Sequence, residues 1–243
     1  MTDLVRIVLV EPSHPGNVGS VARAMKNMAL ADLVLVRPRS MPHPEAIALA
    51  AGADDVLASA KVVDTVAAAI ADCAFVAGTT SRPRNLSWEF ATPREAAARI
   101  NALAAGSRAA LLFGSERYGL ANEDLNHCAL LVRIPANDAY CSLNLAMSVL
   151  LLSYEVFLAR EQPAGRTQLE APLAEGADLE HFYAHLERVL GEIEFGDRTG
   201  YLMDRLRRLF NRTGLDRNEL NILRGILSAV SGRRRRAART GGE

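Results

Sequence analysis

Three polar turns rich in glycine, asparagine and serine each follow an apolar run of this chain. The runs are residues 5–10, 109–113 and 130–134, and each leads through its turn into a helical pattern. Strands buried on both faces of a parallel sheet are nearly continuous apolar runs. In α/β sheets, ligands bind beyond the carboxyl ends of the strands. The pattern therefore predicts an α/β fold with a mainly parallel sheet and one ligand crevice formed by the three turns.

Further strands and helices are predicted between these turns. Further strands are predicted at the apolar runs 33–36, 62–63 and 74–77. A helix start is predicted at Thr92-Pro-Arg-Glu95, which combines a capping threonine, a first-turn proline and a glutamate three residues after the cap. From Ser142 to about Arg160, apolar residues recur at helical spacing, and we expect one long face to be buried in the core or between subunits. That face comprises Leu143, Met147, Leu150, Leu151, Tyr154 and Leu158.

The chain divides into two folded parts in this interpretation. Residues 1–161 form the α/β domain, and residues 162–176, with two prolines, two glycines and no periodic pattern, form a linker. Residues 177–243 form a small helical extension, in which Asp216-Arg-Asn-Glu219 resembles a capping box. We expect this extension to bury little core alone.

The composition excludes several classes of protein. No window approaches the roughly 18 uninterrupted apolar residues of a membrane span, and the first residues lack a basic and apolar signal pattern. We therefore expect a cytoplasmic protein. Cys73, Cys128 and Cys141 are odd in number and form no C-x-x-C pair, so we expect reduced packing cysteines and no thiolate metal site.

The formal net charge of zero conceals a segregation of charge. Residues 1–197 contain 16 basic and 24 acidic residues, whereas residues 198–243 contain 12 arginines and 4 acidic residues. The extension ends in a basic tail, Arg233, Arg234, Arg235 and Arg236. Arginine forks pair well with phosphates, so the tail is a candidate nucleic-acid contact. A solvated terminal tail remains the alternative.

The first polar turn is followed by a basic side chain, that of Arg23. Asn17, Ser20 and Arg23 can face one crevice, since the turn opens a helix and Arg23 lies a helical turn beyond Gly19. The glycines are weak evidence, because Gly16-x-x-Gly19 lacks the full dinucleotide-binding pattern. An exposed helix arginine is the alternative for Arg23.

Two further turns offer backbone donors, hydroxyls and charges. The turn formed by Gly78, Thr79, Thr80 and Ser81 could bind a nucleoside, and Arg82 and Arg84 could contact phosphates, although an ordinary strand-to-helix turn also explains it. Glu116 lies between Gly114 and Gly119 and could pair with an arginine such as Arg84.

The last turn precedes the long helix. It carries amides and hydroxyls together with Tyr140, and Ser142 could cap the helix or hold a ligand. These two roles are compatible.

Three motifs in order carry a resemblance to a known class. They are Val10-Glu-Pro-Ser-His-Pro-Gly-Asn-Val-Gly-Ser-Val-Ala-Arg-Ala-Met25, Phe113-Gly-Ser-Glu-Arg-Tyr-Gly-Leu120, and residues 134–147 with Asn144-Leu-Ala-Met147. Residues 4 to about 160 resemble the SPOUT class of S-adenosylmethionine-dependent RNA methyltransferases, and within it the bacterial TrmJ-like tRNA ribose 2′-O-methyltransferases. The linker and extension are similar to that subgroup but less diagnostic.

The resemblance implies a fold, a cofactor and partners. It implies a deep trefoil knot around residues 113–144, although knots are rare, and a homodimer whose partner subunit completes the RNA side of the site. The methyl donor S-adenosylmethionine would bind in a bent conformation, and no metal is needed. Its expected contacts are Gly78, Thr79, Thr80, Ser81, Gly114, Glu116, Ile134, Ser142, Leu143 and Asn144.

The resemblance also implies a reaction, the attack of a ribose 2′-hydroxyl on the donor methyl group. Arg23 would accept or polarise the hydroxyl proton, or contact the substrate phosphate, and Asn17 and Ser142 would orient it. Arginine is a poor base at its usual pKa, so the phosphate role is equally physical. The RNA pocket would be shaped by Arg82, Arg84, Glu116 and Tyr140, with tRNA also held by the basic extension.

The function predicted from the sequence is therefore 2′-O-methylation of a ribose in the tRNA anticodon loop, at nucleotide 32 with cytidine or uridine. Two alternatives retain the fold: a 2′-O-methyltransferase for another tRNA or ribosomal RNA position, and a catalytically idle RNA-binding protein. A nucleotide-binding metabolic enzyme with a helical tail is a further alternative. The intact set Asn17, Arg23, Glu116, Ser142 and Asn144 favours an enzyme.

Overall fold

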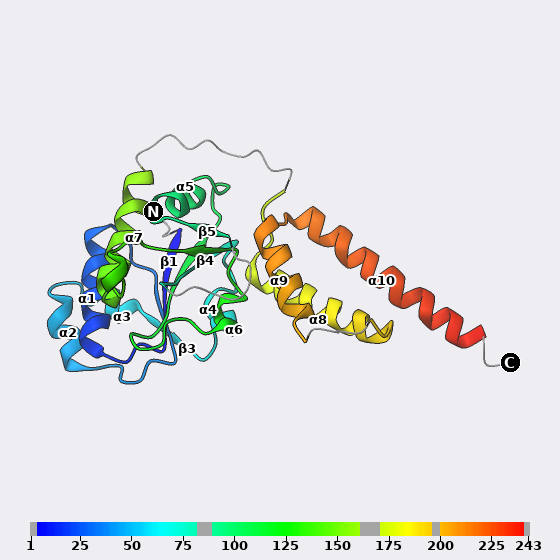
Figure 1. Cartoon of the computed structure of the whole chain (residues 1–243), viewed down its shortest axis with the longest axis horizontal. Coiled ribbons are helices and arrows are strands. Elements are labelled where there is room, and N and C mark those ends of the chain that lie inside the picture. Colours follow the sequence, from blue (N-terminus) through cyan, green and yellow to red (C-terminus); the bar gives the residue numbers. More distant parts are fainter. Residues whose placement is uncertain (1–3, 82–88, 161–170, 196–199, 241–243) are drawn as a thin grey trace.

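The computed structural model describes residues 4–81, 89–160, 171–195 and 200–240, with side chains up to residue 232. Figure 1 shows an α/β part followed by a group of helices that extends away from it. The elements are, in order, β1 (Val5–Val10), α1 (Pro15–Asn27), β2 (Leu33–Val36), α2 (Pro44–Ala50), α3 (Asp54–Ser59), β3 (Lys61–Val63), α4 (Val66–Ala69), β4 (Phe75–Thr79), β5 (Phe90–Ala91), α5 (Pro93–Asn101), β6 (Ala109–Phe113), α6 (Asn122–Leu125), β7 (Leu130–Val132), the 3₁₀ turn η1 (Asp138–Tyr140), α7 (Leu145–Arg160), α8 (Gly176–Glu192), α9 (Leu202–Thr213) and α10 (Arg217–Thr240).

The described strands form one sheet in the order β3-β2-β1-β6-β4-β7-β5, and every pair of neighbours is parallel. The predicted α/β class with a mainly parallel sheet is confirmed. Strand β5 was missed because it has only two residues, and β7 ends at Val132, earlier than predicted. The trefoil knot stays a prediction.

The two faces of the sheet are covered unequally. Along β1, Ile7 and Leu9 join a core under the long helices α1, α5 and α7, whereas Val8 and Val10 join a second core under α4 and α6. Helices α4 and α6 have four residues each, so they are single turns. At the edge of the sheet, Lys61 and Val62 of β3 are exposed, so the expectation that every strand is covered on both faces is wrong there.

The face of α7 that we predicted to be buried does not meet the core of its own chain, so burial between subunits is the part of that prediction that stays open. The helix packs against α1 and α5 through Leu145, Val149, Leu152 and Val156. The predicted residues Met147, Leu150, Leu151 and Tyr154 are exposed instead, and Leu143 precedes the helix. The error arose because α7 is apolar on both sides, so helical spacing alone could not identify which side meets the sheet. One apolar face of α7 therefore remains uncovered in the single chain.

Helix caps follow the predicted chemistry, with one exception. Thr92 and Glu95 form a reciprocal capping box at the start of α5, and Asp216 and Glu219 do the same at α10. At α7, however, the side chain of Asn144 accepts hydrogen bonds from the backbone of residues 146 and 147. Asn144, and not Ser142, therefore caps this helix.

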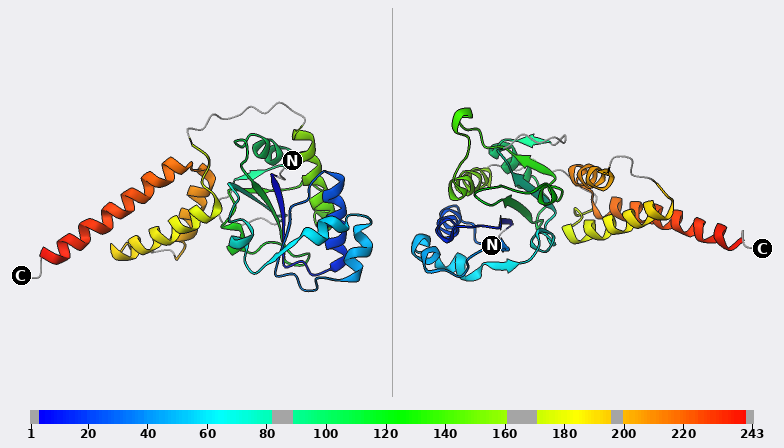
Figure 2. Two further views of the ribbon diagram at one scale, coloured as in Figure 1. Left: turned by 180° about the vertical axis from the view of Figure 1, so that it is seen from behind. Right: turned by 60° about the horizontal axis from the view of Figure 1, so that its bottom comes forward.

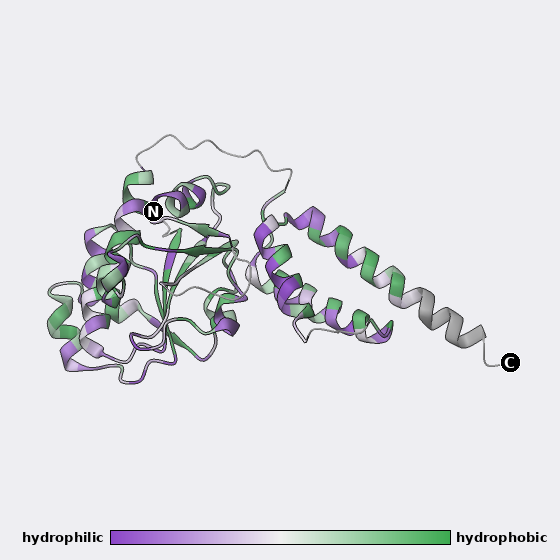
Figure 3. Ribbon diagram, in the orientation of Figure 1, coloured by the Kyte–Doolittle hydropathy of each residue, from purple (hydrophilic) through white to green (hydrophobic). Residues whose placement is uncertain are grey.

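Helices α8, α9 and α10 have a core of their own, built around Phe182, Tyr183, Leu186 and Leu220. Figure 3 shows polar and apolar residues alternating along these helices, as expected of amphipathic helices. We call α8–α10 the C-terminal module. Its helix α10 extends away from the sheet in each view of Figure 2. None of the helices within the described ranges is long and apolar enough to cross a membrane.

The C-terminal module docks on the thinly covered face of the sheet. The backbone N–H groups of Gly176 and Ala177 donate to the carbonyls of Cys73 and Ala71, at 2.9 and 2.8 Å. A side chain at position 176 would bring a Cβ within 2.5 Å of the Ile70 carbonyl oxygen, so this close approach requires glycine. The start of α8 is thus joined directly to the turn between α4 and β4.

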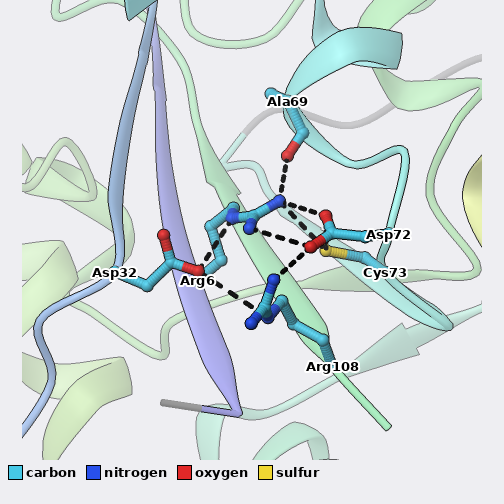
Figure 4. A network of polar contacts seen from close by, with 6 residues as sticks. All are labelled: Arg6, Asp32, Ala69, Asp72, Cys73 and Arg108. Carbon is cyan, nitrogen blue, oxygen red and sulfur yellow. Dashed lines mark hydrogen bonds and ion pairs between the residues drawn. The ribbon is translucent and has the colours of Figure 1, made fainter. Parts of the chain in front are cut away.

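The same turn is held from the other side by a buried arginine, shown in Figure 4. Arg6 of β1 is 4% exposed, and its guanidinium bonds Asp72 at 3.2 Å, Asp32 at 3.0 Å and the Ala69 carbonyl at 2.7 Å. Arg108 also pairs with Asp72. Burial acts to raise the pKa of Asp72, but the hydrogen bond from Arg6 and the positive charges of Arg6 and Arg108 together outweigh it, and the pKa is lowered. A charged network therefore adds to the burial of Ile70 and Cys73 in fixing the turn on which the module docks.

Replacing Arg6 should destabilise the fold. We expect Arg6→Leu to lower the free energy of unfolding by about 2–3 kcal/mol at pH 7, less than for a fully buried pair because Arg108 still reaches Asp72. A lowered carboxyl pKa stabilises the fold above the unfolded value near 4, so the difference from wild type should shrink as the pH falls below about 4. Urea unfolding at pH 7 and pH 3 measures both effects. Lys26→Met, which breaks the exposed Lys26–Asp55 pair, is the control, and an equal loss in both variants would contradict the assignment.

Candidate active site

A cavity of about 400 Å³ lies where β4, β6 and β7 end. This volume falls within the range of small-molecule sites. Its walls come from the predicted turn after β4, the turn 114–119 after β6, and the turn before α7. The cavity lies at the carboxyl ends of parallel strands, as predicted. The first of the three predicted turns, after β1, is not in its described wall, and the turn after β4 takes that place.

One carboxylate joins the cavity wall to the turn after β1. Glu116 accepts hydrogen bonds from the Ser13 hydroxyl at 2.6 Å, the Ser13 backbone N–H at 2.9 Å and the His14 N–H at 3.3 Å. It also accepts from Nδ2 of Asn17, at 2.8 Å. The predicted pairing with Arg84 falls partly outside the described residues, and the described partners of Glu116 belong to the turn that opens α1.

The chain of hydrogen bonds continues to α7. Oδ1 of Asn17 accepts from Nδ2 of Asn144 at 3.0 Å, and Asn144 caps α7 through its own Oδ1. The Asn17 amide is therefore fixed in one orientation, with its nitrogen toward Glu116 and its oxygen toward Asn144. Three turns from distant parts of the sequence are joined in this way. We call Glu116, Asn17 and Asn144 the loop clasp.

The loop clasp needs a negative charge on Glu116. Burial of its carboxyl acts to raise the pKa, but hydrogen bonds from Asn17 and Ser13 outweigh burial and lower the pKa to about 2. A carboxylate surrounded by donors is favoured in its ionised form. Glu116 is therefore ionised at neutral pH, and proton exchange with substrate is not its natural role.

Glycine at position 114 is required by close packing within the turn after β6. A Cβ there would lie 2.0 Å from the carbonyl carbon of Gly119, which itself has a φ of +69°. Gly19 of α1 is equally constrained, since its Cβ would lie 2.1 Å from the Ala46 carbonyl oxygen of α2. Gly19 of the first motif thus serves the packing of α1 against α2. This agrees with the weak evidence that the motif gave for a dinucleotide site.

Most predicted donor-binding residues line the cavity, but two do not. Gly78 lies within β4 and packs against Cys128, and Asn144 belongs to the loop clasp. The predicted residues in the wall are Thr79, Thr80, Ser81, Gly114, Glu116, Ile134, Ser142 and Leu143. Sequence patterns missed Phe113, Val132, Leu145 and Ser148, which lie at ends of strands or in the first turn of α7.

Arg23 is not part of this cavity wall. It lies exposed on α1, and it makes no hydrogen bond or ion pair within the described ranges. Tyr140 is also exposed, 79% of its surface, in the turn before α7. Arg82 and Arg84 lie outside the described residues, as do the side chains of Arg233, Arg234, Arg235 and Arg236, whose backbone belongs to α10.

The lining of the cavity suits a nucleoside with an amino acid part. Hydroxyls come from Thr80, Ser81 and Ser142, and apolar surface comes from Ile134 and Leu143. Such a mixture of apolar walls and a few polar groups is typical of small-molecule sites. No group of histidine, cysteine or acidic residues within the described part of the chain is placed to hold a metal ion. Cys73 and Cys128 are buried thiols, and burial raises the pKa of Cys73 to about 12.

Known proteins resemble this chain over almost its whole length. A tRNA (cytidine/uridine-2′-O-)-methyltransferase TrmJ of Sodalis glossinidius is 50% identical over 233 residues, which cover 93% of this chain and 91% of that protein. A tRNA (cytidine/uridine/adenosine-2′-O-)-methyltransferase TrmJ of Pseudomonas aeruginosa is 46% identical and covers 94% of both chains. The crystal structure of TrmJ from Z. mobilis ZM4 superposes with a TM-score of 0.83 at 36% identity, over 93% of this chain and 98% of that chain.

Two family models match separate parts of the chain. The SpoU rRNA Methylase family matches residues 4–154, and the TrmJ C-terminal domain of tRNA methyltransferases matches residues 177–241. The first match contains every element that forms the cavity, and the second contains the described C-terminal module. The chain therefore belongs to the SpoU methylase family, and within it to the TrmJ methyltransferases.

Proposed function

We propose that this protein methylates the ribose 2′-hydroxyl of nucleotide 32, a cytidine or uridine, in the tRNA anticodon loop. The observation that carries the proposal is the cavity at the carboxyl ends of β4, β6 and β7, in a chain half identical to a TrmJ tRNA methyltransferase. The name of the Pseudomonas aeruginosa relative adds adenosine to cytidine and uridine, so base preference is the feature most open to variation. Loops of tRNA expose riboses that duplexes hide.

S-adenosylmethionine is the proposed methyl donor. Thr79, Thr80 and Ser81 would bind it from one side, and Ile134 with Leu143 would contact its apolar surface. When bound, it would supply a methyl group: the bond from the methyl carbon to sulfur would break as the ribose oxygen bonds to that carbon, and the hydroxyl proton would pass to water. The loop clasp keeps the three turns in place before the donor arrives, and preformed geometry lowers the entropic cost of the reaction.

Arg23 is proposed to act on the RNA side of a site shared by two subunits. It lies outside the cavity wall of its own chain, on α1 beside α7. Its planar guanidinium can hold a phosphate oxygen of the substrate and the attacking hydroxyl together. Ser142, in the cavity wall, and Asn17, in the loop clasp, would complete the orientation of the substrate. Holding the phosphate needs no departure from the ordinary pKa of arginine.

The uncovered face of α7 supports the proposal of a homodimer. Met147, Leu150, Leu151 and Tyr154 expose apolar surface on the helix that packs beside α1. A two-fold axis through this face would place α1, which lies beside α7, close to the interface in both subunits, and we propose that Arg23 reaches the partner's site there. The module on the opposite face of the sheet leaves this surface accessible. We propose accordingly that residues 1–161 form the catalytic domain, 162–176 the linker and 177–243 the RNA-holding extension, in the cytoplasm.

Two alternatives keep the same fold. A methyltransferase for another tRNA position or for ribosomal RNA would use the same donor cavity, and an idle RNA-binding protein would keep the basic extension alone. The loop clasp favours an enzyme, because RNA binding by itself does not require three turns to be joined around a donor-sized cavity.

Loss of Arg23 should abolish the modification. We expect tRNA from cells that carry Arg23→Ala to lack the 2′-O-methyl group at nucleotide 32, as tRNA from cells without the gene does. Arg23→Lys should rescue little, because lysine lacks the planar fork. Mapping of 2′-O-methyl groups in tRNA is the measurement, and calorimetry with S-adenosylmethionine is the control for donor binding. An unchanged map without the gene would reject the function, whereas normal modification by Arg23→Ala would reject only the role of Arg23.

Neutralising the basic tail should weaken tRNA binding. We expect replacement of Arg233, Arg234, Arg235 and Arg236 by glutamine to reduce the slope of log affinity against log salt by about 0.7–0.9 for each phosphate that the tail neutralises in the wild-type complex. Donor binding should not change, since the cavity contains none of these residues. Filter binding of tRNA at several salt concentrations measures the slope. An unchanged slope would show that the tail is solvated and does not contact tRNA.

The uncovered α7 face should mediate dimerisation. Light scattering of the full chain at micromolar concentration should give twice the mass of 26.3 kDa. Leu150→Glu should shift the mass toward one subunit, because a charge cannot be buried unpaired at an apolar interface. Ile47→Glu, at an exposed apolar residue of α2, is the control. A wild-type protein with the mass of one subunit would contradict the proposed pairing.

A further inference from the structure

An exposed tyrosine projects from the rim of the cavity, and the proposed mechanism does not use it. Tyr118 lines the cavity and is 56% exposed. The guanidinium of Arg117 lies 5.2 Å from the centre of its ring. What distinguishes Tyr118 from other exposed aromatic residues is its place at the cavity with a cation beside the ring, a combination that surfaces for single-stranded RNA use.

The turn that carries Tyr118 is held rigidly. The Gly119 backbone N–H donates to the Ser115 carbonyl at 2.8 Å, and the Tyr118 N–H donates to the Ser115 hydroxyl at 3.3 Å. Directly after it, Leu120 is buried in the core, and before it Glu116 belongs to the loop clasp. Both ends of the turn are therefore fixed, and the ring is presented on a preformed support. A rigid aromatic surface loses little entropy when a base stacks on it.

The charge at this rim fits RNA better than it fits the methyl donor. S-adenosylmethionine carries a positive sulfonium, a positive ammonium group and one carboxylate, so its net charge is positive and the Arg117 guanidinium repels it overall. A phosphate next to a stacked base has the opposite charge and would attract it. The exposed ring therefore favours a nucleotide of the substrate as its ligand.

A second exposed ring lies on the neighbouring turn. Tyr140 belongs to η1, directly before the cavity-lining residues Cys141 and Ser142. The turns after β6 and β7 thus each contribute one exposed tyrosine and one part of the same cavity wall. Single-stranded RNA is commonly bound by splayed bases that stack on aromatic side chains. Tyr140 was predicted from the sequence as an RNA contact, and Tyr118 was not.

We infer that Tyr118, supported by Arg117, is a stacking platform for the base next to the target nucleotide, and that it thereby selects single-stranded loop RNA. The inference rests on the proposed function and names a specificity-determining residue for the same reaction. Stacking places the neighbouring base outside the cavity and so leaves the target ribose at the entrance. A base held in a duplex cannot reach the ring without unstacking, which gives the platform its preference for loops.

The test compares Tyr118→Leu with Tyr118→Phe in the full chain. Because Tyr118→Leu removes the ring on which the base stacks, we expect this variant to raise KM for tRNA about tenfold and to change kcat less than about twofold. Tyr118→Phe keeps the ring and should retain the wild-type KM. Phe90→Leu is the matched control, since Phe90 is an exposed aromatic residue of β5 that does not line the cavity.

A direct measurement of stacking uses anticodon stem-loop RNAs with 2-aminopurine on the 5′ or the 3′ side of the target nucleotide. Wild type and Tyr118→Phe should quench the fluorescence of one of these probes, and Tyr118→Leu should lose that quenching. Unchanged quenching and unchanged KM in Tyr118→Leu would overturn the inference. Weaker binding of S-adenosylmethionine by Tyr118→Leu, measured by calorimetry, would also overturn it, because the ring would then belong to the donor site. If wild type methylates no tRNA, the proposed function fails, whereas the quenching still tests the platform.

Discussion

The ionised carboxylate of Glu116 is the interaction on which the site depends. Each strand of the sheet delivers its turn to the same edge, but parallel pairing alone does not fix how the turns lie relative to one another. Glu116 bonds the turn that opens α1, and Asn17 passes the connection to Asn144 and α7. Because the pKa of Glu116 is lowered to about 2, its carboxylate stays ionised well below neutral pH, and the connection is kept there. The cavity is thus assembled before any ligand binds.

The uneven cover of the sheet determines where the other surfaces lie. Long helices α1, α5 and α7 cover one face, and α7 leaves apolar residues exposed on its outer side. Single-turn helices α4 and α6 cover the other face, and the C-terminal module completes that cover. The proposed subunit interface and the module therefore use opposite faces, and neither competes with the cavity at the ends of the strands. The proposed subunit interface, the docking surface of the module and the cavity thus occupy three separate places on one sheet.

The sequence could predict what depends on local chemistry and short-range pattern. The parallel α/β class, the caps at Thr92 and Asp216, and most of the cavity wall followed from apolar runs and polar turns. Side-chain partners over long distances could not be predicted in this way. The bond from Glu116 to Asn17 spans 99 residues, and Arg6 reaches Asp72 across 66. The buried side of α7 also escaped, because both of its sides are apolar and only packing distinguishes them.

The docking of the C-terminal module has a consequence for how ionic strength acts on this protein. Two backbone hydrogen bonds and a glycine contact at residue 176 hold the start of α8, and these neutral contacts are hardly screened by salt. Further along the module, the carboxylates of Glu180 and Asp204 contact His127 and Asn126 of the α/β part. Added salt should therefore release RNA from arginines without detaching the helices that carry them. The salt dependence of RNA affinity then reports mainly the counterions that the arginines displace. Measuring RNA affinity at several salt concentrations then gives the number of phosphates that the protein neutralises, while the C-terminal module stays docked.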